Sequence, residues 1–124
     1  MTEIQNPKPL YDLENRTYLF AQNVRDYAKK LSRTISNIEY GRQLIRSSGS
    51  QAANYIEANE SLGKKDFLMH VKISRKESKE SRFFLKLIDI PESGENERKF
   101  LIQESTELMN IFGAIYRKSG ENNS

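Results

Sequence analysis

The sequence contains no cysteine and no tryptophan, and it has one histidine and three prolines in 124 residues. Without cysteine the chain has no disulfide and no thiolate metal ligand, and a single histidine cannot supply a histidine-rich zinc site. No apolar run approaches the ~18 residues that a membrane-spanning helix needs, and the first residues do not resemble a secretory signal. We therefore expect a cytoplasmic protein of bacterial type that holds no metal and no other cofactor and does not enter a membrane.

The scarcity of proline leaves long stretches of the chain open to helix formation. Pro7 and Pro9 disfavour helix near the N-terminus, and Pro91 separates two helical patterns. Apolar residues recur at spacings of three and four along four segments, which predicts helices at about 13–34, 37–59, 64–89 and 95–118. Four such helices with short connections favour an all-α, up-down-up-down four-helix bundle. The predicted organisation is an N-terminal arm (1–11), one bundle domain (12–118) and a flexible C-terminal tail (119–124).

Small residues stand where the second and third predicted helices of a bundle would usually carry leucine. The predicted core stripe of the second helix consists of Ile38, Gly41, Ile45, Ser48, Ala52 and Ile56. The small residues of the two helices are Ser48, Gly49, Ala52, Ser74, Ser78 and Ser81. Small side chains let two backbones approach closely, so we expect these helices to cross tightly. The alternative is that the serines are only tolerated on a solvated face.

The third predicted helix has two further flanks beside its core stripe. On a helical wheel one flank is basic and consists of Lys72, Arg75, Lys79, Arg82 and Lys86. The opposite flank carries the apolar residues Met69, Ile73, Phe84 and Leu87 and is interrupted by Glu77 and Glu80. A monomeric bundle needs one apolar stripe per helix, and exposed apolar patches usually mark an interface. The second apolar flank therefore predicts that the chain assembles with copies of itself.

The basic flank has two interpretations. Lysine and arginine are what any solvated helix face carries, and the net charge of +3 permits an anionic partner without requiring one. Alternatively, five cations along about 20 Å of helix match the track of a phosphate backbone, and an oligomer would multiply their field. Binding of RNA or DNA would then tolerate many sequences and depend strongly on salt, because nothing in the chain resembles a base-reading motif.

Two segments, RSSGSQAANYIEA and KKDFLMHVKISRKESKESRFFLKL, carry an ordered pattern of polar and aromatic residues. The matching positions of the first segment are Arg46, Ser47, Ser50, Ala53, Asn54, Glu57 and Ala58. Those of the second are Lys65, Phe67, Lys76, Glu77, Glu80, Phe84 and Leu85. Over about residues 13–116 the chain resembles the bacterial four-helix bundle protein family, whose members are also called 23S rRNA intervening-sequence proteins. That family commonly has tryptophan where this chain has Phe84, which is a conservative difference.

The resemblance implies an up-down bundle that assembles as a homopentamer. The accessory proteins of diversity-generating retroelements look like the same fold, and there the pentamer binds nucleic acid and a reverse transcriptase. No enzymatic activity is established for the family at large. The resemblance therefore strengthens the predicted fold and the oligomer and leaves the function open.

The polar residues of the two segments favour a structural network over a catalytic site. We expect Arg46 to pair with Glu80 or Glu77 and Asn54 to satisfy the remaining acceptors, near or within the subunit contact. Ser50 and Glu57 belong to the same motif. The Glu-x-x-His pairs of di-metal bundles are absent from the sequence, and the predicted helix phase directs the only histidine away from the serines of the second helix. We expect no catalytic residue and no enzyme.

Two functions remain open at this stage. The first is an oligomeric scaffold or adaptor that engages RNA, DNA or a nucleic-acid enzyme through its basic surface. The second is a purely structural or protein-binding module without a nucleic-acid role. Salt-dependent binding of nucleic acid distinguishes the two.

Overall fold

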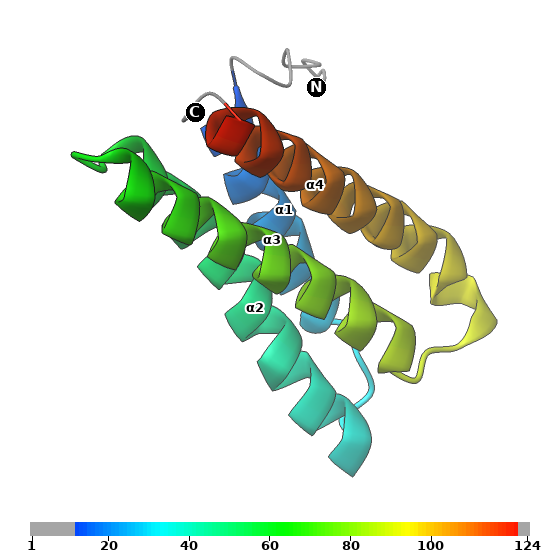
Figure 1. Cartoon of the computed structure of the whole chain (residues 1–124). Helices are drawn as coiled ribbons and strands as arrows, with labels where there is room; N and C mark the ends of the chain where they lie inside the picture. The colour runs from blue at the N-terminus through cyan, green and yellow to red at the C-terminus, as the bar shows by residue number, and fades with distance from the viewer. Residues whose placement is uncertain (1–11, 122–124) are drawn as a thin grey trace.

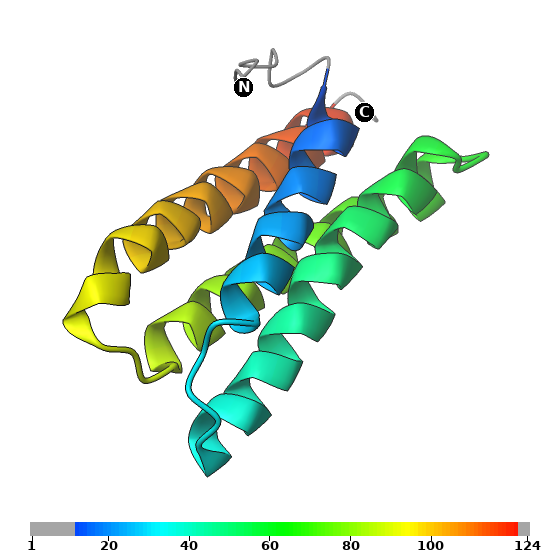
Figure 2. The ribbon, with the colours of Figure 1, turned by 180° about the vertical axis from the view of Figure 1, so that it is seen from behind.

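The computed structural model describes residues 12–121. Over that range the chain forms four long helices, one short 3-10 helix and no strand: α1 Leu13–Ala28, α2 Ile35–Asn59, α3 Lys64–Leu87, η1 Glu92–Gly94 and α4 Glu95–Glu121. Successive long helices run antiparallel (Figure 1). Each packs against two neighbours, so that α1 lies diagonally opposite α3, between α2 and α4 (Figure 2). The predicted all-α four-helix bundle is confirmed for the described residues.

The connection between α1 and α2 begins earlier than predicted. α1 ends at Ala28, and α2 begins at Ile35 because the Thr34 hydroxyl accepts a hydrogen bond from the Asn37 backbone N–H at 3.1 Å. That N-cap satisfies a donor that the helix itself leaves free. The expected boundary near residue 34 was wrong because the apolar spacing continues through the loop. Ile35, which continued that spacing, is 91% exposed.

The ends of the other helices differ from the predictions by a few residues. α3 stops at Leu87 rather than at 89, and α4 continues to Glu121 rather than ending near 118. The predicted arm (1–11) and the last three residues of the predicted tail lie outside the described range. No helix within residues 12–121 combines the length and the apolar character that crossing a membrane requires.

The contact between α2 and α3 is close and polar. The hydroxyls of Ser47 and Ser81 lie 2.9 Å apart, and the Ser74 hydroxyl donates to the Gln51 backbone carbonyl at 2.9 Å. A side chain as short as serine reaches the backbone of a neighbouring helix only when the two backbones are close, as the small residues predicted. Gly49 does not take part, because it is exposed and a Cβ built on it would meet nothing within 4 Å.

The buried face of α2 differs from the predicted stripe. Ile38, Ile45 and Ile56 are 41%, 47% and 45% exposed, so they do not form the core stripe. The helix instead buries Leu44 and several polar residues, including Gln51, whose side-chain amide donates to the Thr17 carbonyl of α1 at 2.8 Å. This hydrogen bond offsets part of the cost of burying Gln51, whose Oε1 atom is buried with no partner among the described residues. Gly41, Ser48 and Ala52 of the predicted stripe are buried, so the prediction was right for the small residues of α2 and wrong for its three isoleucines.

Candidate functional site

The predicted basic flank lies along α3 beside α4. Four of its side chains are exposed, and the fifth, Arg82, is half-buried and donates to the Thr106 hydroxyl of α4 at 3.4 Å. Together the five form the basic stripe: Lys72, Arg75, Lys79, Arg82 and Lys86. The rise of about 1.5 Å per residue spreads them over about 20 Å of the helix surface.

No side chain of the basic stripe pairs with a carboxylate within residues 12–121. Cations elsewhere in the bundle do pair: Arg16 of α1 lies 2.7 Å from Glu104 and 2.6 Å from Glu107. The hydrogen bond to Glu104 contributes most to raising the pKa of the Arg16 guanidinium. The pKa of Glu107 is lowered, first by a hydrogen bond from the Gln103 amide and then by Arg16. These α4 carboxylates therefore neutralise a cation of α1, and the stripe keeps its charge.

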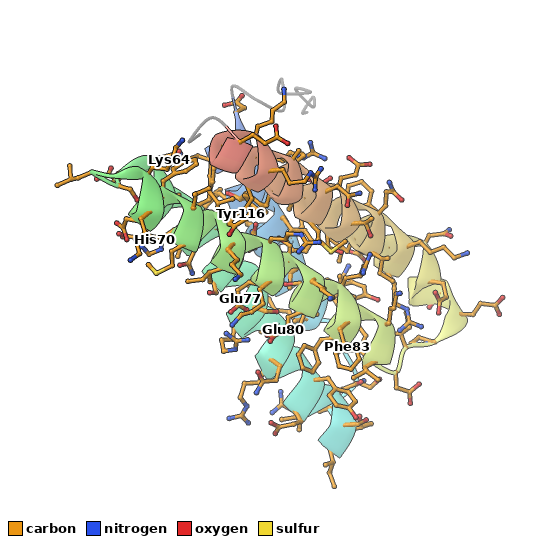
Figure 3. The ribbon with its side chains drawn as sticks, viewed as in Figure 1. Lys64, His70, Glu77, Glu80, Phe83 and Tyr116 are labelled. Carbon is orange, nitrogen blue, oxygen red and sulfur yellow. The ribbon has the colours of Figure 1, made fainter. Side chains whose placement is uncertain are left out.

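The C-terminal part of α4 extends the basic surface. A hollow of about 300 Å³ between α3 and α4 is lined by Lys72, Arg75, Gly113, Tyr116 and Arg117. Figure 3 shows Tyr116 on the side of α4 that faces α3. The α4 residues were not predicted as part of a site, although a glycine inside a helix, followed by Tyr and Arg one turn later, is an available signal.

The predicted apolar flank of α3 is only partly exposed. Met69 and Leu87 are 47% and 39% exposed, whereas Ile73 and Phe84 are half-buried. Phe84 packs within its own chain, with its ring centroid 6.1 Å from that of Tyr40 on α2. The neighbouring Phe83, which the prediction did not include, is 55% exposed and labelled in Figure 3. That this flank contacts another subunit stays a prediction.

Arg46 of α2 contacts both acidic side chains that the sequence proposed as its partners. Its Nη2 atom lies 3.2 Å from Glu77 Oε1 and also donates to Glu80 Oε1. Glu77 is 5% exposed and Glu80 is half-buried; both are labelled on α3 in Figure 3. The contact joins α2 to α3 beside the serine pairs, which is a structural role.

Asn54 does not join the Arg46 contact, contrary to the prediction. Its amide nitrogen donates to the Ser50 carbonyl at 3.0 Å and to the Ser50 hydroxyl at 3.2 Å, while its Oδ1 lies 3.0 Å from His70 Nδ1. The residues from 46 to 54 span two turns of α2, so the two polar groups are separate. His70 therefore approaches the serine segment through Asn54, although it was expected to point away. The remaining motif residue, Glu57, is exposed.

The described side chains do not form a familiar catalytic or metal arrangement. Ser50 bonds to Asn54 rather than to His70, whose Nε2 lies 3.7 Å from the Asp66 carboxylate. Within residues 12–121 no three His, Asp or Glu side chains gather as a metal site would need. Another hollow, of about 320 Å³, lies between the end of α1 and the start of α2 and has Leu31 and Ile38 in its wall. Among the described residues, the surface between α3 and α4 therefore offers cations without carboxylate partners beside the aromatic ring of Tyr116.

Comparison with known proteins places the fold and gives no activity. No protein-family model matches the sequence, and no curated protein matches it either. Among solved structures, the chain is similar to a protein of unknown function from the S23 ribosomal protein family of Bacteroides thetaiotaomicron, with a TM-score of 0.71 and 22% sequence identity. The match covers 83% of this chain and 96% of that one. The chain thus shares its four-helix bundle with a structure from the S23 ribosomal protein family.

Proposed function

We propose that this chain is a non-enzymatic, oligomeric module that binds the phosphate backbone of RNA or DNA through the basic stripe. The observation that carries the proposal is that five cations lie along one face of α3 without a carboxylate partner within residues 12–121, whereas Arg16, Lys30 and Arg46 elsewhere in the bundle are paired. Unpaired cations on one face attract a polyanion and release its counterions on binding.

Self-association is the second part of the proposal. Met69 near the start of α3 and Phe83 and Leu87 near its end are large apolar side chains at the surface, which a second copy would cover. The resemblance to the 23S rRNA intervening-sequence proteins supports a homopentamer, in which five copies of the stripe would multiply the positive field. By the same resemblance, a nucleic-acid enzyme such as a reverse transcriptase is a candidate partner.

A protein-binding module without a nucleic-acid role is the second candidate function. The observation that favours it is the exposed row of Ile38, Ile45 and Ile56 on α2, on another face of the bundle from the basic stripe. Three isoleucines spaced by seven and eleven residues present one apolar edge, as helices that dock onto other helices do.

Titration of a labelled single-stranded RNA by fluorescence anisotropy, at salt concentrations from about 50 to 200 mM, tests the nucleic-acid proposal. For about five phosphate contacts the logarithm of the affinity should fall with the logarithm of salt with a slope of about −3.5. Reversing three stripe charges (Lys79→Glu, Arg82→Glu and Lys86→Glu) should weaken binding at least tenfold and reduce the slope by about 2.

A matched control reverses three cations at the α1–α2 end of the molecule: Lys29→Glu, Arg33→Glu and Arg42→Glu. This control variant changes the net charge by the same amount as the stripe variant, so a specific role of the stripe requires that the control bind RNA much more tightly. If both variants lose the same affinity, binding depends only on net charge. If the parent does not bind at micromolar protein, the nucleic-acid role is refuted. Light scattering on the same samples gives the subunit number, and the mass of a single chain would refute self-association.

A further inference from the structure

Two arginines converge on a glycine at the α3–α4 contact. Gly113 is buried within α4, and a Cβ built on it would lie 3.2 Å from Arg75 Nε and 3.4 Å from Arg117 Nη1. Because both nitrogens lie within 3.4 Å of the same Cβ position, they are at most about 7 Å apart. Glycine is unfavourable inside a helix. Here the absence of a Cβ leaves room for the Arg75 side chain to pass over α4.

The convergence brings two like charges together. Within residues 12–121 neither guanidinium pairs with a carboxylate, and Lys72, in the same hollow, does not either. Like charges at this distance repel each other, and an anion between them removes the repulsion. Planar guanidinium groups donate pairs of hydrogen bonds that match phosphate oxygens.

An aromatic ring completes the hollow. Tyr116 is 37% exposed and lines the same space of about 300 Å³. Nucleic-acid bases stack on exposed aromatic rings whatever their sequence, and they do so next to the cations that hold the backbone. The hollow therefore offers a nucleotide two kinds of contact, one for its phosphate and one for its base.

We infer that the hollow at Gly113 binds one nucleotide, with its phosphate held by Arg75 and Arg117 and its base against Tyr116. The inference deepens the proposed function and rests on it, because it gives the basic surface one defined anchor for a nucleotide of single-stranded RNA or DNA. Lys79, Arg82 and Lys86, further along α3, would then contact the neighbouring phosphates.

The test uses the whole chain and adenosine 5′-monophosphate as the probe, in about 50 mM salt. Binding is followed by saturation-transfer difference NMR, which reads the ligand protons whatever the size of the assembly. Gly113→Ala places a methyl group where Arg75 and Arg117 meet, and it should weaken binding roughly tenfold, the effect of losing one charge-assisted hydrogen bond. The matched control is Gly49→Ala, the same change inside α2, where a Cβ meets nothing within 4 Å; it should leave binding unchanged.

The outcomes separate this inference from the proposed function. Equal binding by the two alanine variants, or no saturation transfer to the nucleotide at millimolar concentration, overturns the hollow as a nucleotide site. The stripe variant in the RNA titration still decides the proposed function on its own. In a second arm inorganic phosphate competes with the nucleotide. If phosphate binds as tightly as the nucleotide and Tyr116→Leu has no effect, the base contact is refuted.

Discussion

Replacing Arg46 by methionine removes the cation that joins α2 to α3 and keeps an unbranched apolar stem in place of the arginine stem. Glu77 is 5% exposed, and within residues 12–121 its carboxylate has one partner, Arg46 at 3.2 Å. Removing one member of a fully buried pair costs about 3–5 kcal/mol. Because the Arg46 side chain is 48% exposed, water screens the contact, and a smaller value applies. We expect a loss of about 2 kcal/mol in the free energy of unfolding, or roughly 8 °C in Tm for a chain of this length.

Urea unfolding followed by circular dichroism at pH 7 measures this loss, with every variant at one protein concentration because assembly contributes to apparent stability. The matched control is Arg42→Met, which removes an exposed arginine one turn earlier on α2. A double-mutant cycle with Glu77→Gln isolates the pair, and we expect a coupling of about 1 kcal/mol or more. If Arg46→Met unfolds at the same urea concentration as Arg42→Met, or if the two changes are additive, the contact contributes nothing and the reasoning is refuted.

The remaining predictions concern single polar side chains. Ser78 is fully buried and its hydroxyl has no hydrogen-bond partner among the described residues, so Ser78→Ala should raise the free energy of unfolding by about 1 kcal/mol. Ser74→Ala, which removes a bonded hydroxyl, should lower it by about the same amount; equal effects of the two changes in urea unfolding would contradict this. Hydrogen bonding from Gln103 and the charge of Arg16 lower the pKa of Glu107 in the folded chain. Its stabilising contribution is therefore complete above its unfolded pKa of about 4.3 and disappears as pH falls through the lowered value. The stability difference between the parent and Glu107→Gln should decrease as pH falls below about 4.3 and vanish only below the lowered pKa, and a difference that does not change with pH would exclude the ionic contribution.

The third helix shows how much the sequence could predict. The small residues of its buried side and the cations of its exposed side could be assigned because burial follows the helical period closely when polar and apolar residues are well separated. Ser74 and Ser81 are buried as predicted, and Arg46 contacts the two acidic residues expected for it. The buried serines follow from the period of one helix, whereas the Arg46 contact joins residues 31 and 34 positions apart and was predicted because α2 and α3 were expected to lie close together.

The second helix shows why the rest could not be predicted. Its buried face includes Asn37, which exchanges two hydrogen bonds of 2.8 Å with the backbone of Asp89, just after the end of α3. Such hydrogen bonds allow a polar residue to be buried. They join residues that are 52 positions apart, so no local sequence pattern predicts them. Apolar spacing favoured Ile38 for the same face, and tertiary hydrogen bonding decided against it. The hollow at Gly113 was missed for a similar reason, since it needs the side chains of two helices.

The serine contacts between α2 and α3 have a consequence for how the basic surface meets a ligand. Leucine layers permit small axial slips between helices, whereas hydroxyl bonds of 2.9 Å at Ser47–Ser81 and Ser74–Gln51 are directional and fix the register of the two helices. A slip of one residue, about 1.5 Å, would misalign both bonds. The serine contacts therefore hold α3 in one position along α2, while the rise of about 1.5 Å per residue sets the spacing of the stripe cations. Under the proposed function, a flexible strand of RNA or DNA would adapt its phosphates to that spacing.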